Sequence, residues 1–284
     1  MRIVVAAMGR LVPELVLLAC ELSRRFESVS VLLGSNDTAS ERLAACARLH
    51  NARFGLWSTD EPNAELQRRL EGADAVIHLP PRTEEAPPDS RSLRQDSIGY
   101  VAEAVKRLGH RCPRKIVEVV PAQELEAGDE DDVAATVTSG VRVCTAQIGV
   151  VLRAPGGALR RTLCALRAQA ALNRASCLGL VRWIHELDGV RAIAHVLEND
   201  SLTGRFNLMA PAPVPAATFA STIWSAYGLP SSLRGPATAS VGRLLDAPPL
   251  AGPVATPRRL VESGFAYLFP DLPSALADLT EQNS

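Results

Sequence analysis

The chain has 284 residues, of which 47% are hydrophobic, enough for one large domain with a sizeable core or for a domain with a small appendage. Its formal net charge of -1 at pH 7 gives no electrostatic case for binding nucleic acid or an anionic membrane. Six scattered cysteines without a CxxC pair predict reduced, mostly buried thiols. The sequence shows no signal-peptide pattern and no apolar run near the ~20 residues of a membrane helix, so a cytoplasmic protein is expected.

The N-terminal residues predict the start of a dinucleotide-binding α/β fold. Met1–Ala7 is short, apolar and β-branched, which is typical of a buried parallel strand, and a helix is predicted over Leu11–Leu22. In that fold a turn rich in glycine brings the pyrophosphate onto the helix N-terminus. The turn here holds a single glycine, Gly9. If a nucleotide binds, Gly9 and Arg10 are its expected contacts in this turn.

The next part of the chain contains a candidate ribose ligand. A second strand is predicted over Ser28–Leu33, and Asp37 stands late in the turn that follows it. A dinucleotide fold carries an acid near this place for the ribose hydroxyls. Asp37 is equally suited to N-cap the next predicted helix, Ala39–Leu49, and the statistics of N-cap residues favour this second role.

The elements expected after this helix are strand Ala52–Trp57, helix Ala64–Leu70, strand Asp74–Leu79, a polar loop Arg82–Ser92, helix Leu93–Leu108 and strand Lys115–Val120.

His78 stands near the carboxyl end of the fourth predicted strand. Ligands of open α/β sheets bind beyond the carboxyl ends of the strands, so His78 is well placed to face a ligand. The plainer interpretation is a half-buried histidine that is hydrogen-bonded at the end of its strand.

The chain after the fifth strand carries two charged stretches. The acidic stretch Pro121–Asp132 lacks a calcium-loop pattern, so a solvated surface loop is favoured over a metal site. A sixth strand is predicted over Val141–Leu152, and the arginines of the amphipathic helix Gly156–Ala171 favour a solvated basic face over an anion-binding one. The last core elements expected are the segment Val181–Asp188, helix Val190–Glu198 and strand Arg205–Met209, and the composition then changes to Pro, Ala and Ser.

Five stretches occur in a fixed order: GADAVIHL, IGVVLRAPGGAL, WIHELD, LENDSLTGRFNLMAPAPV and LVESGFAYLFPDLPSAL. Together they resemble the epimerase-like branch of the extended short-chain dehydrogenase/reductase superfamily, most specifically from Val141 onward. The resemblance implies an NADP-type cofactor in ordinary members and a substrate cleft over the strand ends. The expected fold class is α/β. A Rossmann-like doubly wound parallel sheet is expected over residues 1–210, with a cleft-forming insertion near 154–183. A smaller C-terminal substrate lobe is expected over residues 211–284.

The cofactor turn departs from that family. The family pattern GGTGFIG, laid on this chain without gaps, places the binding-loop glycines on Ala7, Met8, Arg10 and Pro13. Side chains there should fill the space that the pyrophosphate needs. Glu14 adds negative charge at the start of the helix, and Arg10 compensates for it in part. We therefore expect no cofactor, with NADP as the cofactor if the ordinary function is retained.

The redox residues of the superfamily are also missing. Its members use a Tyr and a Lys four residues later, so that both lie on one helical face and the Lys lowers the pKa of the phenol. Four positions after the three tyrosines of this chain (Tyr100, Tyr227 and Tyr267) stand Ala104, Ser231 and Asp271. The sequence therefore contains no such pair, and we interpret the catalytic segment as deleted.

Four residues are candidates for acid/base chemistry in a cleft without cofactor: His78, Gln147, Arg182 and His185. The plainer interpretation of His185 is a hydrogen-bonded structural histidine, and that of the nearby Asp188 is a helix N-cap.

Three functions stay open for such a chain. The favoured hypothesis is a cofactor-independent descendant that acts on a small organic molecule by cyclisation, isomerisation or elimination. The second is a non-catalytic pseudoenzyme that binds a ligand or a protein partner, and the third is an NADP-dependent reductase or epimerase with an atypical loop. A metal, nucleic acid or membrane is not expected, and a homodimer or a complex with a homologous partner is left open.

Overall fold

The computed structural model describes residues 1–7, 12–34, 52–57, 64–80, 90–122, 140–154, 159, 163, 179–228 and 256–282. The helices and strands of these residues are, in chain order, β1 (Arg2–Ala7), α1 (Val12–Arg25), β2 (Ser28–Gly34), β3 (Arg53–Trp57), α3 (Ala64–Leu70), β4 (Ala75–Leu79), α4 (Ser90–Leu108), the 3-10 helix η1 (Gly109–Arg111), β5 (Lys115–Pro121), β6 (Arg142–Ile148), β7 (Val150–Leu152), β8 (Leu180–Val181), β9 (Trp183–His185), α7 (Glu186–Glu198), β10 (Gly204–Leu208), β11 (Val214–Pro215), α8 (Ala216–Ala226), α11 (Arg258–Glu262) and α12 (Leu272–Glu281).

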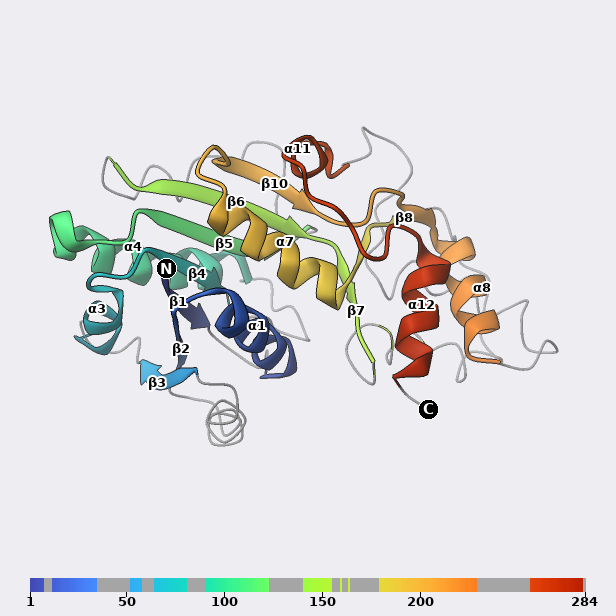
Figure 1. The fold of residues 1–284 in the computed structure, drawn as a ribbon, viewed down its shortest axis with the longest axis horizontal. Helices are drawn as coiled ribbons and strands as arrows, with labels where there is room; N and C mark the ends of the chain where they lie inside the picture. Colours follow the sequence, from blue (N-terminus) through green and yellow to red (C-terminus); the bar gives the residue numbers. More distant parts are fainter. Residues whose placement is uncertain are drawn as a thin grey trace. The chain divides into compact units, whose positions relative to one another are not determined.

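The largest sheet of the described residues has seven strands in the order β10-β6-β5-β4-β1-β2-β3 (Figure 1). Strand β1 pairs in parallel with β2 and β4, β2 pairs in parallel with β3, and β4 with β5. The chain thus builds outward from β1 first to one side and then to the other, which is the doubly wound arrangement of a Rossmann-like fold. The predicted α/β fold class is confirmed.

Two compact units share the chain. The first comprises residues 1–120, 124–146 and 193–205, and the second comprises residues 121–123, 147–192 and 206–284. Their bounds fall inside β6, α7 and β10, so the units alternate along the sequence. The functional division at residue 210 into a core and a substrate lobe stays a prediction.

The core of the first unit forms where α3 and α4 cover one face of the parallel strands. Parallel strands are buried on both faces, which is why β1, β4 and β5 read as continuous apolar runs. The buried side chains of this cluster include Val4, Ala6, Leu32, Leu66, Val76, Ile98, Val101, Val105 and Ile116.

The core of the second unit is built from its helices and two small sheets. Helices α8 and α12 contact each other, β7 pairs in parallel with β9, and β8 pairs with β11 in antiparallel. Buried aromatic side chains fill the space between these elements: Trp183, Phe219 and Trp224.

The predicted strand Val141–Leu152 is wrong in one respect, because it consists of two strands that separate at Gly149. A Cβ at this position would lie 2.6 Å from the carbonyl oxygen of Arg182, so only glycine fits between the two segments. The amide of Val150 donates to the same carbonyl at 2.7 Å, and β7 leaves the main sheet to pair with β9.

Several predictions fall outside the described residues. These are the contacts of Gly9, Arg10 and Asp37, the helix over 39–49, most of the acidic stretch 121–132 and most of the helix over 156–171. The polar loop predicted to end at Ser92 ends earlier, because α4 already begins at Ser90. Within the described ranges, no helix is long and apolar enough to cross a bilayer.

Candidate functional site

The four candidate residues divide between the two units. His78 belongs to the first unit, and Gln147, Arg182 and His185 belong to the second.

His78 lies on β4, one residue before the strand ends, and its side chain is 0% exposed. It pairs in register with Ala6 of β1 on one side and with Glu118 of β5 on the other. Directly paired residues of parallel strands project to the same face of the sheet. That face is the one covered by α4, because Val76 and Ile116, two residues earlier in each strand, pack in the cluster with α4.

A hydroxyl and a carboxylate flank the imidazole of His78. The Oγ atom of Ser97, on α4, lies 3.0 Å from Nε2. The Oε1 atom of Glu118 lies 3.8 Å from Nδ1, which is an electrostatic contact rather than a hydrogen bond. Ser97 is 1% exposed and Glu118 is 0% exposed, so the whole group is buried.

The order of the three side chains permits a proton arrangement that leaves Nε2 to accept the Ser97 hydroxyl. An ionised carboxylate only accepts, so an ionised Glu118 would favour the tautomer of His78 that carries its proton on Nδ1. Nε2 is then the acceptor for the hydroxyl of Ser97. The same order of hydroxyl, imidazole and carboxylate lets enzymes withdraw a proton from a hydroxyl group.

Burying this group opposes folding, since polar and ionisable side chains lose hydration when they enter a core. Clusters of this kind at the carboxyl ends of parallel strands are candidates for function. The sequence predicted His78 but not its partners. The signal for Glu118 was present, because it is the one carboxylate inside the apolar run KIVEVV. Ser97 had no signal, since its contact depends on how α4 packs.

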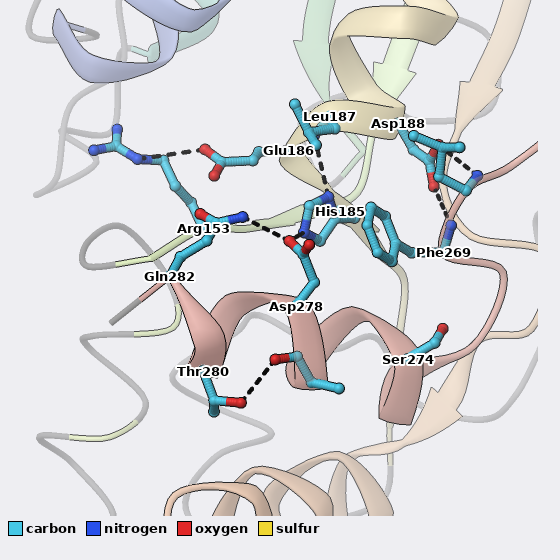
Figure 2. A network of polar contacts seen from close by, with 12 residues as sticks. Arg153, His185, Glu186, Leu187, Asp188, Phe269, Ser274, Asp278, Thr280 and Gln282 are labelled. Atoms are coloured by element: carbon cyan, nitrogen blue, oxygen red, sulfur yellow. Dashed lines mark hydrogen bonds and ion pairs between the residues drawn. The ribbon is translucent and has the colours of Figure 1, made fainter. Parts of the chain in front are cut away.

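His185 has a structural role at the start of α7. Its side chain is 0% exposed, and Nδ1 accepts the amide N–H of Leu187 at 3.2 Å, so the ring caps the helix. Nε2 lies 3.2 Å from Oδ2 of Asp278 on α12, and the ring of Phe269 lies 3.9 Å away between centroids (Figure 2). Burial lowers the pKa of His185 against the opposing charges of Asp278 and Asp188. The plain interpretation as a hydrogen-bonded structural histidine fits these contacts.

The predicted N-cap role of Asp188 is wrong, and so is the helix start at Val190, because α7 begins at Glu186 with His185 before it. Asp188 lies in the first turn and is 0% exposed. Its carboxylate instead accepts the amide N–H groups of Leu268 and Phe269, each at 2.9 Å, and the guanidinium of Arg191 at 2.9 Å. The carboxylate thereby fixes the segment that precedes α12.

Gln147 and Arg182 stand beside the separation of β6 from β7. Gln147 is 9% exposed on β6. Arg182, half-buried between β8 and β9, uses its carbonyl oxygen to accept the amide of Val150. Burial lowers the pKa of its guanidinium. Their catalytic roles stay predictions.

The tyrosines provide no equivalent of the Tyr/Lys redox pair. Tyr267 donates its hydroxyl to the carbonyl of Met209 at 2.7 Å, and burial raises its pKa, which is opposite to the activated phenol that a neighbouring Lys produces. Tyr100 packs edge-on against Trp57, with ring centroids 6.4 Å apart. Asp271, four residues after Tyr267, accepts the amide of Ser274 as the N-cap of α12.

Residues other than glycine stand at the glycine positions of the family's pyrophosphate-binding pattern. Ala7, at the first glycine position of the family pattern, is the last residue of β1 and is 0% exposed, so its Cβ is packed in the core. Its carbonyl oxygen accepts the indole N–H of the buried Trp57 at 3.2 Å. The other glycine positions of the pattern carry Met8, Arg10 and Pro13 in the sequence. Among the described residues, no group of three or more His, Cys, Asp or Glu side chains could hold a metal ion.

Comparisons with known proteins find relatives that are named epimerase family proteins. No family model matches it. An epimerase family protein of Mycobacterium bovis is 35% identical over 136 residues, which cover 45% of this chain and 44% of that protein. The matched stretch thus spans less than half the length of this curated relative.

Two solved structures share the fold over nearly the whole chain. The crystal structure of the human epimerase family protein SDR39U1, solved with NADPH, has a TM-score of 0.68 at 21% identity and covers 99% of both chains. A nucleoside-diphosphate-sugar epimerase from Pseudomonas aeruginosa has a TM-score of 0.65 at 18% identity and covers 100% of this chain and 99% of its own. At these identities the likeness shows the fold. The curated relatives show in addition that about half of the chain is similar to epimerase family proteins.

Proposed function

We propose that this protein acts on a small organic molecule by non-redox acid/base chemistry and needs no nicotinamide cofactor. The observation that carries the proposal is the buried contact of His78 with Ser97 and Glu118 near the carboxyl end of β4. The sequence supports it by retaining no Tyr/Lys pair.

The proposed chemistry is a proton transfer through the Ser97 hydroxyl. Ser97 gives its proton to Nε2 of His78 and takes one from the ligand, and the transfer reverses to return a proton at another ligand atom. Glu118 stabilises the imidazolium that forms between the two transfers. All three side chains are buried, so the structure beside β4 has to open before a ligand reaches the hydroxyl.

This chemistry suits isomerisation, cyclisation or elimination, because none of these reactions consumes a hydride. In the same proposal the protein is cytoplasmic, and its partner is a small molecule rather than a nucleic acid or a membrane. A homodimer or a homologous partner would be compatible with this role.

Deuterium exchange tests the proposal without a known substrate. Small enolisable ketones, 2-oxo acids and lactones would be incubated with the protein in D₂O without nucleotide, and loss of their C–H signals followed by proton NMR. Removing a general acid/base typically costs 10²–10⁴-fold, so we expect His78→Gln and Ser97→Ala to lower the exchange rate by about this factor. His110→Gln, an exposed histidine of η1, is the matched control and should leave the rate unchanged. Exchange that survives His78→Gln, or that requires NADPH, would contradict the proposal.

The second candidate function is an NADP-dependent reductase or epimerase with an atypical loop. The observation that favours it is that the human protein of the same fold was solved with NADPH. Titrating NADPH and NADH while following nucleotide fluorescence separates the two candidates, because micromolar binding would restore the second. If neither nucleotide binding nor deuterium exchange is found, the non-catalytic pseudoenzyme becomes the favoured function.

A further inference from the structure

Two polar side chains of the second unit stand without a partner among the residues that the structure describes: the guanidinium of Arg182 and the side-chain amide of Gln147. Arg182 is half-buried between β8 and β9, and Gln147 is 9% exposed on β6. Charged and polar side chains that leave water normally gain a counter-charge or a hydrogen bond in exchange. None of the described residues supplies such a group to either side chain.

The backbone sets these two side chains on one face. The parallel register of β7 and β9, continued by one residue, sets Gly149 opposite Arg182. The amide of Gly149 donates to the carbonyl of Leu208 on β10 at 3.0 Å. The next amide, that of Val150, donates to the carbonyl of Arg182 at 2.7 Å. Consecutive amides that donate to different segments are typical of extended backbone, in which residues two apart share a face.

Gln147, two residues before Gly149, is therefore the diagonal neighbour of Arg182 on that face. With about 3.3 Å per residue along a strand and about 4.8 Å between strands, the Cα atoms of Gln147 and Arg182 are roughly 8 Å apart. Long side chains bridge such a separation. The residue between them on the face is a glycine, so no third side chain separates the amide from the guanidinium.

The carboxylates around the start of α7 are engaged with other groups (Figure 2). The pairs are Glu186 with Arg153, Asp188 with Arg191, and Asp278 with Gln282. Burial is the one effect that shifts the pKa of the Arg182 guanidinium, and it lowers this pKa. In the described part of the chain, no carboxylate thus balances the charge of Arg182.

We propose that Arg182 and Gln147 bind the carboxylate group of a small organic acid. The guanidinium presents a planar fork of N–H donors that matches the two oxygens of a carboxylate, and the amide of Gln147 adds a further N–H donor. The single positive charge of Arg182 is balanced by one carboxylate, whereas a phosphate group near its second ionisation carries more negative charge than this pair neutralises. The site belongs to the second unit and does not depend on the proposed function.

Titration of the full-length protein with sodium acetate, sodium benzoate and inorganic phosphate at constant ionic strength tests the site. Binding would be followed by ligand-observed NMR, on the protons of the two acids and on the phosphorus of phosphate. We expect saturable binding of acetate and benzoate and weaker binding of phosphate. Arg182→Gln should weaken the binding of both acids about tenfold or more, because it removes charge-assisted hydrogen bonds. Arg258→Gln removes the same charge from an exposed arginine of the same unit, and as the matched control it should leave the affinity unchanged.

A second variant tests the juxtaposition of the two side chains. Gln147→Glu places a carboxylate within reach of the guanidinium, so it should pair with Arg182 and weaken the binding of acetate and benzoate about as much as Arg182→Gln does. If Arg182→Gln does not fold, this variant decides: lost binding supports the site, and unchanged affinity overturns it. The proposal is also overturned if neither acid binds the wild-type protein, if phosphate alone binds, or if Arg182→Gln keeps the wild-type affinity.

Discussion

His78 and Glu118 are directly paired residues on the neighbouring strands β4 and β5, and their side chains meet on the face of the sheet covered by α4, with Nδ1 3.8 Å from Oε1. Parallel register alone brings these two ionisable groups together, although 39 residues separate them in the sequence, from 79 to 117.

A double-mutant cycle on His78→Leu and Glu118→Leu should give a coupling energy of about 0.5–3 kcal/mol. Each single substitution leaves a buried polar group without the partner it has here, and the double substitution removes both. Urea unfolding of the four proteins measures the coupling. Additivity within about 0.3 kcal/mol would show that the contact is energetically unimportant.

The glycine at the separation of β6 and β7 should be irreplaceable. Gly149→Ala places a Cβ 2.6 Å from the backbone carbonyl of Arg182, and overpacking of this kind costs about 1–3 kcal/mol in the free energy of unfolding. Gly99→Ala on α4 is the matched control, since a Cβ there meets no atom within 4 Å. It should be neutral or stabilising by up to about 1 kcal/mol. Similar unfolding curves for the two variants would count against the close approach.

The carboxylate that fixes the segment before α12 should be important for stability. Asp188→Asn replaces one of two acceptor oxygens with an NH₂ group facing backbone N–H donors, so we expect a loss of about 1–3 kcal/mol. The control is Asp200→Asn. The side chain of Asp200 is 74% exposed and pairs with Arg142 at the surface. Thermal denaturation compares the two. Equal effects would mean that Asp188 contributes no more than a surface ion pair.

Much of the fold was predictable from the sequence because buried parallel strands are short apolar runs. The runs that became β1, β2, β4 and β5 were located to within about a residue or two of their observed ends, and α3 was located with its observed bounds, Ala64–Leu70. The division at Gly149 was missed, because an apolar run does not reveal that its last residues pair with a different sheet.

The candidate site was predictable only in part. His78 was found from its place at a strand end, whereas Ser97 and Glu118 depend on helix packing and strand register, which a sequence does not specify. The early start of α7 was missed for a local reason. Its cap is a histidine, which is not among the residues usually preferred at this position.

Isothermal titration of the purified protein with NADPH decides whether this chain works without a nicotinamide nucleotide. We expect no saturable binding, or binding no tighter than millimolar, because Ala7, Met8, Arg10 and Pro13 stand in the sequence at the glycine positions of the family pattern. A dissociation constant in the micromolar range would contradict it and make the NADP-dependent function the favoured one.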